Sequence, residues 1–534
     1  MATSYGAPGV YIEEVPSGSM PIEGVGTAVA AFVGFTQTYH PEAGDPADPN
    51  GVRPQLVTSW NQYERIYGGF AKGALLPHAV YGFFANGGGT AFIVRIPGGA
   101  GGTAPQRAVI GSATRPELES LRIEALPGGS TGSLAVEVQR PDPAAEGAEP
   151  PAEFTLRVLE NGTPVEEFPG LTLGRGSRGA EKVVNERSTR IRIAAATVPG
   201  ASVADRLPAP GLVPLRSQDL APAAVTPADV AGSEAERTGY RGLAVAEAVT
   251  MVSVPDLTTI ATSPRGEFDL EAYLAMQGQL VDWCEASGRM MAILDPPPGL
   301  SATGALEWRE ALARDSAYAA AYYPRVLVDN PLAPAGATGR DRYLTVPPSG
   351  HIAGVWARTD ALRGVHKAPA NEVLRGIVRL ENDITAGEQD LLNPRGINCL
   401  RSFGSGGMRI WGARTLSTTD PSWRYIPVRR LFIYLEESIR RGTQWAVFEP
   451  NDTDLWERVK RTITAFLRGV WRSGALVGAT PEQAFYVKCD ETNNPPESVD
   501  EGKLIVEIGV CPVKPAEFVI FRISQWQGGA STAE

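Results

Sequence analysis

The sequence predicts a mixed α/β (α+β) protein built from several domains. Its 534 residues are too many for one hydrophobic core, because single cores stop growing at about 250–300 residues. Strand-like and helix-like runs alternate in the first hundred residues and again after residue 235, which is typical of an α/β layer. Short alternating runs between these two stretches indicate a β-rich insertion.

The N-terminal part is predicted to be an arm followed by half of a discontinuous middle domain. A Pro-Gly turn signal precedes 10–15, a run of Val, Ile, Tyr and Glu typical of an exposed strand near a free end. We then expect a buried strand at 28–35, helices at 60–67 and 74–84, and a strand at 92–96. The arm is assigned to 1–20 and the first half of the middle domain to 21–100.

The insertion is assigned to 101–235. It opens at the flexible joint GGAGGTAP, and turn-rich stretches such as PDPAAEGAEPP separate its apolar runs. Strands are predicted at 121–125, 134–138, 154–159 and 191–195. The chain then returns to the middle domain at 236–360.

This second half of the middle domain again alternates strands and helices. Strands are predicted at 243–254, 289–294 and 326–328, and helices at 270–287 and 305–322. The stretch PPSGHIAG is predicted to open a further helix with Ser349 as its N-cap.

The last domain is assigned to 361–515, and the C-terminal arm and tail to 516–534. A helix at 428–441 is expected to end at Gly442, and a helix at 452–472 to begin after Asn451 or Asp452. Apolar residues of the second helix recur at helical spacing, whereas its arginines fall within an arc of roughly 80°. Strands are predicted at 485–488, 504–510 and 518–523.

Composition excludes several functional classes. The 60 acidic and 49 basic residues leave a net charge of -11, which argues against a general nucleic-acid binder. Four separate cysteines show no metal-ligand spacing, so we expect buried thiols in a reducing compartment. The N-terminus lacks the features of a secretory signal, and no run approaches the ~20 apolar residues of a membrane span.

No pattern in the sequence forms a convincing catalytic constellation. Residues 86–90, NGGGT, lack the ending of a P-loop and are predicted to be a turn before a strand. Ser349, His351, Asp360 and His366 lie close in sequence but form no nucleophile elbow or metal motif. By contrast, the segment 391–450 is dense in Trp and Arg, which favours packing and assembly over turnover.

Ordered segments resemble the sheath proteins of contractile phage tails and phage-tail-like injection systems. PGVYIEEVPSGSMPIEGVGTAVAAFVG is similar to the N-terminal signature of that family, and VPPSGHIAGVWARTD followed by RGVHKAPANE to its central one. NPRGINCLRSFGSGGMRIWGARTL, WRYIPVRRLFIYLEESI, QWAVFEPND and PVKPAEFVIFRI continue the match. The resemblance covers about 1–100 and 340–525, whereas the insertion carries no such segment.

The resemblance implies a structural subunit that polymerises helically around an inner tube and contracts from a metastable extended state. It implies no enzymatic activity and no cofactor. The implied partners are further copies of the chain, the inner tube protein, and baseplate and tail-terminator or cap proteins, with no nucleic acid and no membrane insertion. Assembly would take place in the cytoplasm, and the particle would remain there or be released. The insertion would be the variable outer domain.

The resemblance also implies that arms of neighbouring subunits complete the sheet of the C-terminal assembly domain. Such β-augmentation links chains through main-chain hydrogen bonds. The candidate strand-exchange residues are Val10, Tyr11, Ile12, Glu13, Phe518, Val519, Ile520 and Phe521. The candidate inner-tube contacts are Arg458, Arg461, Arg468 and Arg472, for which an ordinary exposed helix face is an equally open interpretation.

Three alternatives remain open at this point. The chain could form the sheath of a true phage tail rather than of an injection system. A Ser/His hydrolase would use Ser349 with His351 or His366. A surface adhesin would rest on the β-rich insertion alone.

Overall fold

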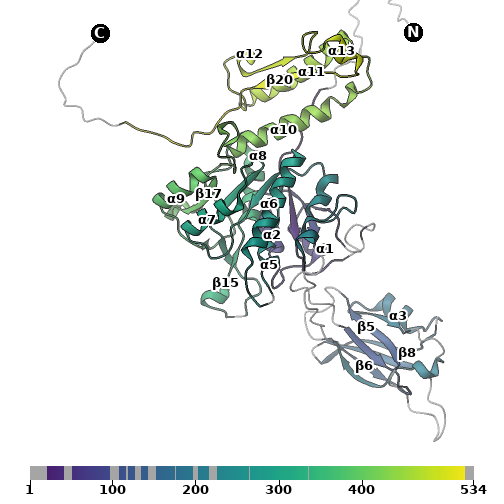
Figure 1. Cartoon of the computed structure of the whole chain (residues 1–534). Helices are drawn as coiled ribbons and strands as arrows, with labels where there is room; N and C mark the ends of the chain where they lie inside the picture. The colour runs from purple at the N-terminus through teal and green to yellow at the C-terminus, as the bar shows by residue number, and fades with distance from the viewer. Residues whose placement is uncertain are drawn as a thin grey trace, which may run out of the picture.

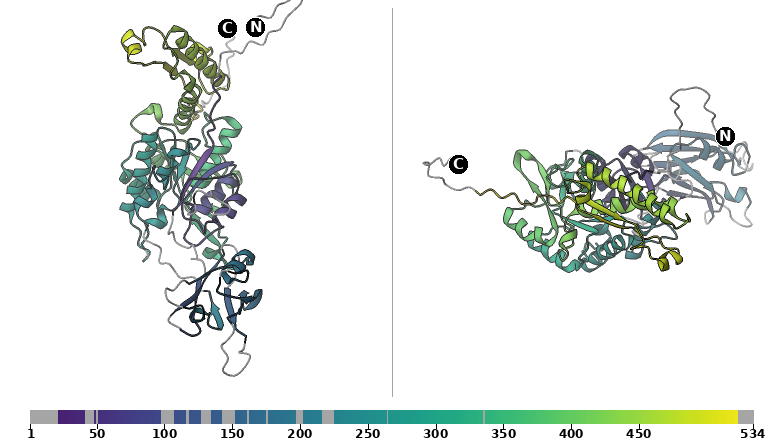
Figure 2. Two further views of the ribbon diagram at one scale, coloured as in Figure 1. Left: turned by 90° about the vertical axis from the view of Figure 1, so that its right-hand side faces the viewer. Right: turned by 90° about the horizontal axis from the view of Figure 1, so that it is seen from above.

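A computed structural model describes most of the chain as three bodies arranged in a row (Figures 1 and 2). It describes residues 21–522 apart from 41–47, 49–50, 97–106, 116–117, 127–133, 142–151, 161, 175, 197–201, 216–224, 264 and 335. The predicted mixed α/β, multidomain class is confirmed by its several sheets and helices.

The central body is built on an eight-stranded sheet that joins two distant parts of the sequence. Six neighbouring strands run parallel, and an antiparallel strand closes each edge. The order across the sheet is β18 (Met408–Trp411), β17 (Ile397–Ser402), β13 (Ala319–Tyr323), β12 (Met291–Leu294), β11 (Met251–Ser253), β1 (Val29–Gly34), β3 (Thr90–Arg95) and β2 (Gln55–Val57).

Helices cover both faces of this sheet, as its buried parallel strands require. Alternate residues of β1 show the two faces: Ala30 and Phe32 belong to one apolar cluster, and Ala31 and Val33 to the other. Helices α1 (Trp60–Tyr67), α2 (Leu76–Ala85) and α8 (Ser349–Arg363) pack on the first face, and α6 (Leu270–Ser287) and α7 (Ala302–Leu312) on the second.

Helices α2 and α8 approach unusually closely through the GHIAG segment of α8. A Cβ atom on Gly350 would lie 2.2 Å from the backbone of Ala79, and one on Gly354 would lie 2.4 Å from the carbonyl oxygen of Phe83. The four-residue spacing puts both glycines on one side of the helix, so this segment serves packing.

The inserted body lies at one end of the molecule, at the lower right of Figure 1. Its two antiparallel sheets enclose their own apolar core, which includes Val136, Leu156 and Ile193. The four-stranded sheet contains β10 (Gly211–Pro214), β6 (Leu134–Gln139), β7 (Phe154–Glu160) and β8 (Thr163–Leu171). The three-stranded sheet contains β4 (Arg107–Gly111), β5 (Glu119–Ala125) and β9 (Ile191–Ala195), beside α3 (Ala180–Arg187).

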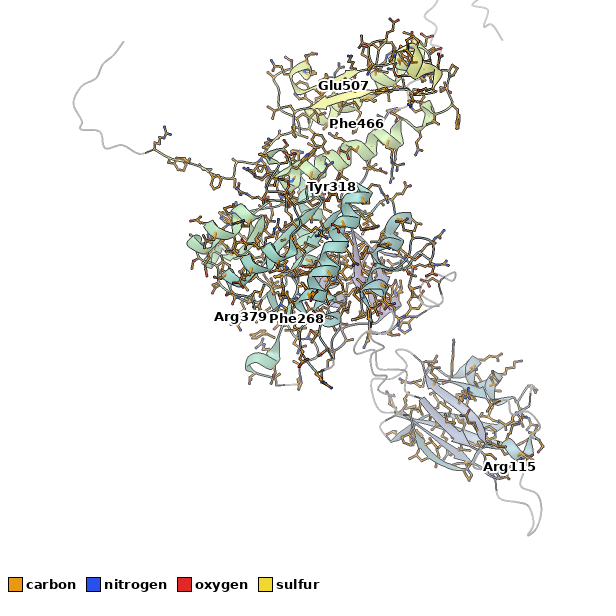
Figure 3. The ribbon with its side chains drawn as sticks, in the orientation of Figure 1. Arg115, Phe268, Tyr318, Arg379, Phe466 and Glu507 are labelled. Atoms are coloured by element: carbon orange, nitrogen blue, oxygen red, sulfur yellow. The ribbon has the colours of Figure 1, made fainter. Side chains whose placement is uncertain are left out.

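The C-terminal body packs two long helices against a two-stranded sheet. Helix α10 (Ile426–Gly442) leads to α11 (Thr453–Arg472), which Asp452 caps by accepting the N–H of Leu455. The apolar side of α11 is buried against β19 (Phe485–Lys488) and β20 (Glu507–Val510). Short helices α12 (Pro481–Ala484) and α13 (Pro496–Asp500) complete this body, in which Figure 3 labels Phe466 of α11 and Glu507 of β20.

Two predicted elements of the middle domain are wrong. The predicted strand at 243–254 is a 3-10 helix, Tyr240–Val245, followed by the short strand β11. The predicted helix at 305–322 ends at Leu312, where Ala313 adopts a left-handed conformation with φ 48°, and the chain then forms β13. The alanine-rich β13 is an interior strand of the sheet, so tertiary burial overrides the helical preference of alanine.

Candidate assembly interfaces

The suggested nucleophile Ser349 is a buried structural residue. Its Oγ donates to Asp295 Oδ2 at 2.6 Å and accepts from Ser253 Oγ at 2.7 Å. Its backbone N–H also donates to Asp295, while Pro348 occupies the N-cap position of α8. The predicted N-cap role of Ser349 is therefore wrong, because the carboxylate of Asp295, the residue after β12, bonds to the helix start instead.

The histidines near Ser349 do not form a triad with it. His351 is buried, and its Nδ1 has no hydrogen-bond partner among the described residues. Burial, reinforced by the nearby His78, lowers the pKa of His351 to about 4. Asp360 instead pairs with Arg430, so serine, imidazole and carboxylate belong to separate contacts.

Replacing His351 with leucine is expected to flatten the dependence of stability on pH. Between the ordinary histidine pKa of about 6.5 and the folded pKa of about 4, the unfolded chain binds one more proton at this site. Stability therefore falls as the pH falls through this window. The variant should reduce that slope by up to about 1.4 kcal/mol per pH unit. Urea denaturation at several pH values measures the slope, and an unchanged slope would contradict the assignment.

The ligand crevice of a doubly wound sheet is filled here by the protein's own side chain. The order of strands reverses between β1 and β11, and such folds bind ligands beyond the strand ends at this point. There Asp256 accepts the backbone N–H groups of Phe35 (2.8 Å), Leu75 (2.5 Å) and Leu76 (3.1 Å). Burial raises the pKa of Asp256 to about 7, although the three N–H groups oppose this shift. The carboxyl group occupies the place at the start of α2 where an anion would bind.

Other ligand classes find little support in the described parts of the chain. No group of three or more His, Cys, Asp or Glu side chains within the described ranges could hold a metal ion. Among the helices that the structure describes, none is long and apolar enough to cross a membrane. The NGGGT segment is the predicted turn between α2 and β3, where buried Asn86 bonds to Gly82 and Arg375.

The sheet of the C-terminal body is incomplete within one chain. Strands β19 and β20 pair antiparallel from Phe485–Val510 to Lys488–Glu507, and neither outer edge pairs with another described strand. One face packs on α11, while on the other face the ring of Tyr486 covers Gly509. A two-stranded sheet has marginal stability and two unpaired edges, so it can accept further strands.

The predicted terminal strands have different outcomes. Val10, Tyr11, Ile12 and Glu13 lie outside the described residues. In the single chain, 518–522 forms no strand, which contradicts the prediction of a strand at 518–523 over its described part. The side chains of Phe518, Val519, Ile520 and Phe521 are 71–82% exposed. Without a partner edge, these residues have no main-chain hydrogen bonds to hold them extended.

The four arginines of α11 are all exposed, but they are not equivalent. The guanidinium of Arg458 lies 3.3 Å from Glu449 and 4.7 Å from the centre of the Trp445 ring. These contacts support the loop between α10 and α11, in which Phe448 is fully exposed at a φ of 69°. Arg458 is thus occupied within its own subunit, while Arg461, Arg468 and Arg472 extend along the exposed side of α11.

The sequence did not predict that Glu517 attaches the C-terminal arm to the rest of the molecule. Glu517, immediately before the exposed apolar residues, bonds to Arg414 and Asn393 of the central body and to Tyr425, the N-cap residue of α10. A lone glutamate beside an apolar run gives no periodic signal. Its partners are about a hundred residues away in sequence, so only the folded chain shows the contact.

Comparisons with known proteins show that parts of the chain are similar to phage tail sheath proteins. The model of the phage tail sheath protein central domain matches 265–416, and that of the phage tail sheath C-terminal domain matches 418–525. The tail sheath protein of Vibrio phage KVP40 is 31% identical over 197 residues, 36% of this chain and 28% of that protein. A putative prophage major tail sheath protein of Pseudomonas aeruginosa (strain UCBPP-PA14) is 30% identical over 190 residues, 34% of this chain and 47% of that protein. The chain thus spans less than half the length of these relatives.

Solved structures show the same fold over nearly the whole chain. The helical sheath of the anti-feeding prophage in its contracted state matches with a TM-score of 0.56 and 24% identity, covering 98% of this chain and 100% of that chain. The sheath complex of the extracellular contractile injection system PVC, also contracted, matches with a TM-score of 0.55 and 24% identity, covering 98% and 99%. Two phage tail sheath domain models thus match 265–416 and 418–525, and the chain shares the fold of these solved sheath proteins.

Proposed function

We propose that this chain is the structural subunit of a contractile sheath. Copies polymerise helically around an inner tube and contract from a metastable extended state, which drives the tube through a target envelope. The observation that carries this proposal is the incomplete β19–β20 sheet, found together with an exposed apolar arm in a chain with the sheath fold.

The subunits are joined by exchanged strands. A strand from a neighbour's arm would pair with a free edge of β19 or β20 through main-chain hydrogen bonds. Such bonds tolerate rotation of the subunits because the arm can turn outside the paired segment. The lattice can then shorten while the copies stay linked.

The proposed function requires no turnover and no cofactor. Ser349 and His351 are buried in separate contacts, and Asp256 fills the crevice at the strand-order reversal. These observations favour a structural role over a hydrolase. Baseplate and cap proteins would end the polymer, and the subunits would be assembled in the cytoplasm. The same strand exchange between copies would serve a phage tail or an injection system.

Negative-stain microscopy of the purified full-length protein tests the proposal. We expect tubes or stacked rings of regular diameter at micromolar protein concentration. Protein that stays monomeric across salt and pH conditions, alone and with its inner tube protein, would contradict the proposed function.

Reversing the charge of Arg461 and Arg468 together is expected to prevent extended particles from forming on the inner tube. Both side chains are exposed on α11, where they could pair with acidic groups that must separate during contraction. Exposed pairs are worth about 0–1 kcal/mol each, so repetition along the tube must supply the strength. The matched control reverses Lys72 and Arg265, two exposed charges of the central body. Electron microscopy counts extended particles, and equal counts for both variants would rule out this contact.

A further inference from the structure

The C-terminal segment is attached to the molecule in two steps before it leaves. Residues following β20 first pair with the chain after α11: the N–H of Val477 donates to Cys511 O at 2.8 Å, and that of Val513 to Ala475 O at 3.1 Å. The second attachment is made by the side chain of Glu517. Beyond it, residues 518–522 have exposed side chains and no described partner element.

The attachment at Glu517 joins the arm to the central body through charged hydrogen bonds. Arg414 Nε donates to Glu517 Oε1 at 2.8 Å, and Arg414 Nη2 donates to Oε2 at 2.6 Å. Asn393 Nδ2 donates to Oε1 at 2.7 Å, and Tyr425 OH donates to Oε2 at 3.2 Å. Arg414 Nε also donates to Oε2 at 3.2 Å, so each carboxylate oxygen has at least two donors and the pairing with arginine is bidentate.

Burial makes this contact stronger than a surface ion pair. The side chains of Arg414 and Glu517 are only 11% and 18% exposed. Burial alone would raise the pKa of Glu517, but the hydrogen bonds from Arg414 and Asn393 outweigh it and lower the pKa. Arg414 is itself held in place, because its Nη1 donates to Asn393 O at 3.2 Å and its backbone N–H donates to Asn398 Oδ1 at 2.7 Å.

The described part of the arm does not return to its own sheet. In Figure 1 and the right-hand view of Figure 2 the chain runs away from β19 and β20 after it passes the central body. Phe518, Val519, Ile520 and Phe521 are 71–82% exposed, which is unfavourable for four consecutive apolar side chains in water. The partner that can bury them and supply strand edges is a second copy of this chain.

We propose that Glu517 is the anchor of the C-terminal arm, holding its root on the central body so that residues 518–521 are presented to a neighbouring copy from a defined position. Motion of the arm between assembly states would then occur beyond Glu517, and tension on the arm would reach the central body through Arg414 rather than pull on β20. This role rests on the proposed sheath function, but the contact itself can be tested in the isolated subunit.

Chymotrypsin cleavage of the full-length subunit measures the anchor without assembly. Cleavage after Phe518 requires Glu517 to leave Arg414 and enter the active site of the protease, whereas cleavage after Phe521 does not. The ratio of the two products therefore reports release of Glu517 from the central body. We expect the E517R variant to raise the ratio of Phe518 to Phe521 cleavage by about tenfold or more, because charge-assisted hydrogen bonds of this kind must open first. The E517Q variant should raise it less.

A charge swap makes the test specific to the pair. The R414E variant should raise the ratio like E517R, and the R414E/E517R double variant should lower it again towards the wild-type value. The matched control is K514E, which reverses an exposed charge three residues earlier and should leave the ratio unchanged. An unchanged ratio in both E517R and E517Q, or no recovery in the double variant, would overturn the anchor.

Microscopy of the same variants separates the anchor from the sheath function. If the wild type forms tubes, E517R should form markedly fewer and the double variant should recover them. Normal tubes from E517R with a released arm would overturn the positioning role. If the wild type itself forms no tubes, the proposed sheath function fails, while the cleavage ratio still decides whether Glu517 holds the arm.

Discussion

A chain lacking residues 1–20 is expected to fold normally and to form no tubes. The deletion removes the predicted strand at 10–15 but leaves the described elements, which begin at β1, intact. If neighbouring arms complete the β19–β20 sheet, the truncated subunit still offers two edges but has lost one of the strands that fill them. Twenty extended residues span at most about 70 Å, which is enough to reach an adjacent subunit.

Two measurements check this prediction together. Circular dichroism and thermal unfolding should match the wild type, while negative-stain images should show single subunits in place of tubes. A matched control removes 142–150, a turn-rich stretch between β6 and β7 of the inserted body, and should still assemble. Tubes formed by the chain without residues 1–20 would show that arm exchange at this end does not hold the lattice together.

Replacing Asp360 with alanine is expected to lower the free energy of unfolding by about 3–5 kcal/mol. Asp360 of α8 and Arg430 of α10 form a bidentate pair at 2.6 and 2.8 Å, and both side chains are only 3% exposed. Thr27 bonds to both partners, and Arg430 also lies 4.8 Å from the centre of the Trp356 ring. Removing the carboxylate would leave a buried guanidinium without its counter-charge.

This pair belongs to the junction between the central and C-terminal bodies. The arginine that precedes Arg430 in α10, Arg429, has its guanidinium group 4.7 Å from the centre of the Tyr318 ring, which Figure 3 shows beneath α10. Loss of the Asp360–Arg430 pair should therefore loosen the attachment of α10 as well as the helix α8. The effect should appear as an earlier transition in urea denaturation followed by tryptophan fluorescence.

Two variants control for the location and the charge of the Asp360–Arg430 pair. Asp282→Ala breaks an exposed pair with Arg314, 55% and 41% exposed, and should cost only about 0–1 kcal/mol. The double variant Asp360→Leu with Arg430→Met should recover most of the loss, because apolar side chains of similar size leave no unpaired charge. An Asp360→Ala protein as stable as the Asp282→Ala protein would show that the pair does not hold the junction.

Local patterns in the sequence were sufficient for much of the fold. Helix α6 agrees with the predicted 270–287, and Gly288 ends it in a left-handed conformation. Helix α11 is capped by Asp452, one of the two predicted cap residues, and buries the predicted apolar side. These elements could be predicted because their signals, caps and helical periodicity, lie within a few residues of each other.

The features that were predicted wrongly from the sequence depend on contacts between residues far apart in the chain. The alanine-rich segment of β13 became a strand because β12 and β17 bond to it on both sides. Ser349 was predicted to cap a helix, but Asp295, which follows β12, accepts hydrogen bonds from both the backbone N–H and the hydroxyl of Ser349.

By itself, the sequence determined the mixed α/β class, the long helices and the family resemblance, because the signals for each lie within continuous stretches of the chain. Only the tertiary structure decided how surfaces are used: Arg458 pairs with Glu449 of its own chain, and Glu517 pairs with Arg414 about a hundred residues away. The physical reason is that charge pairing and burial depend on which side chains the fold brings within a few ångströms, and no local period encodes that proximity.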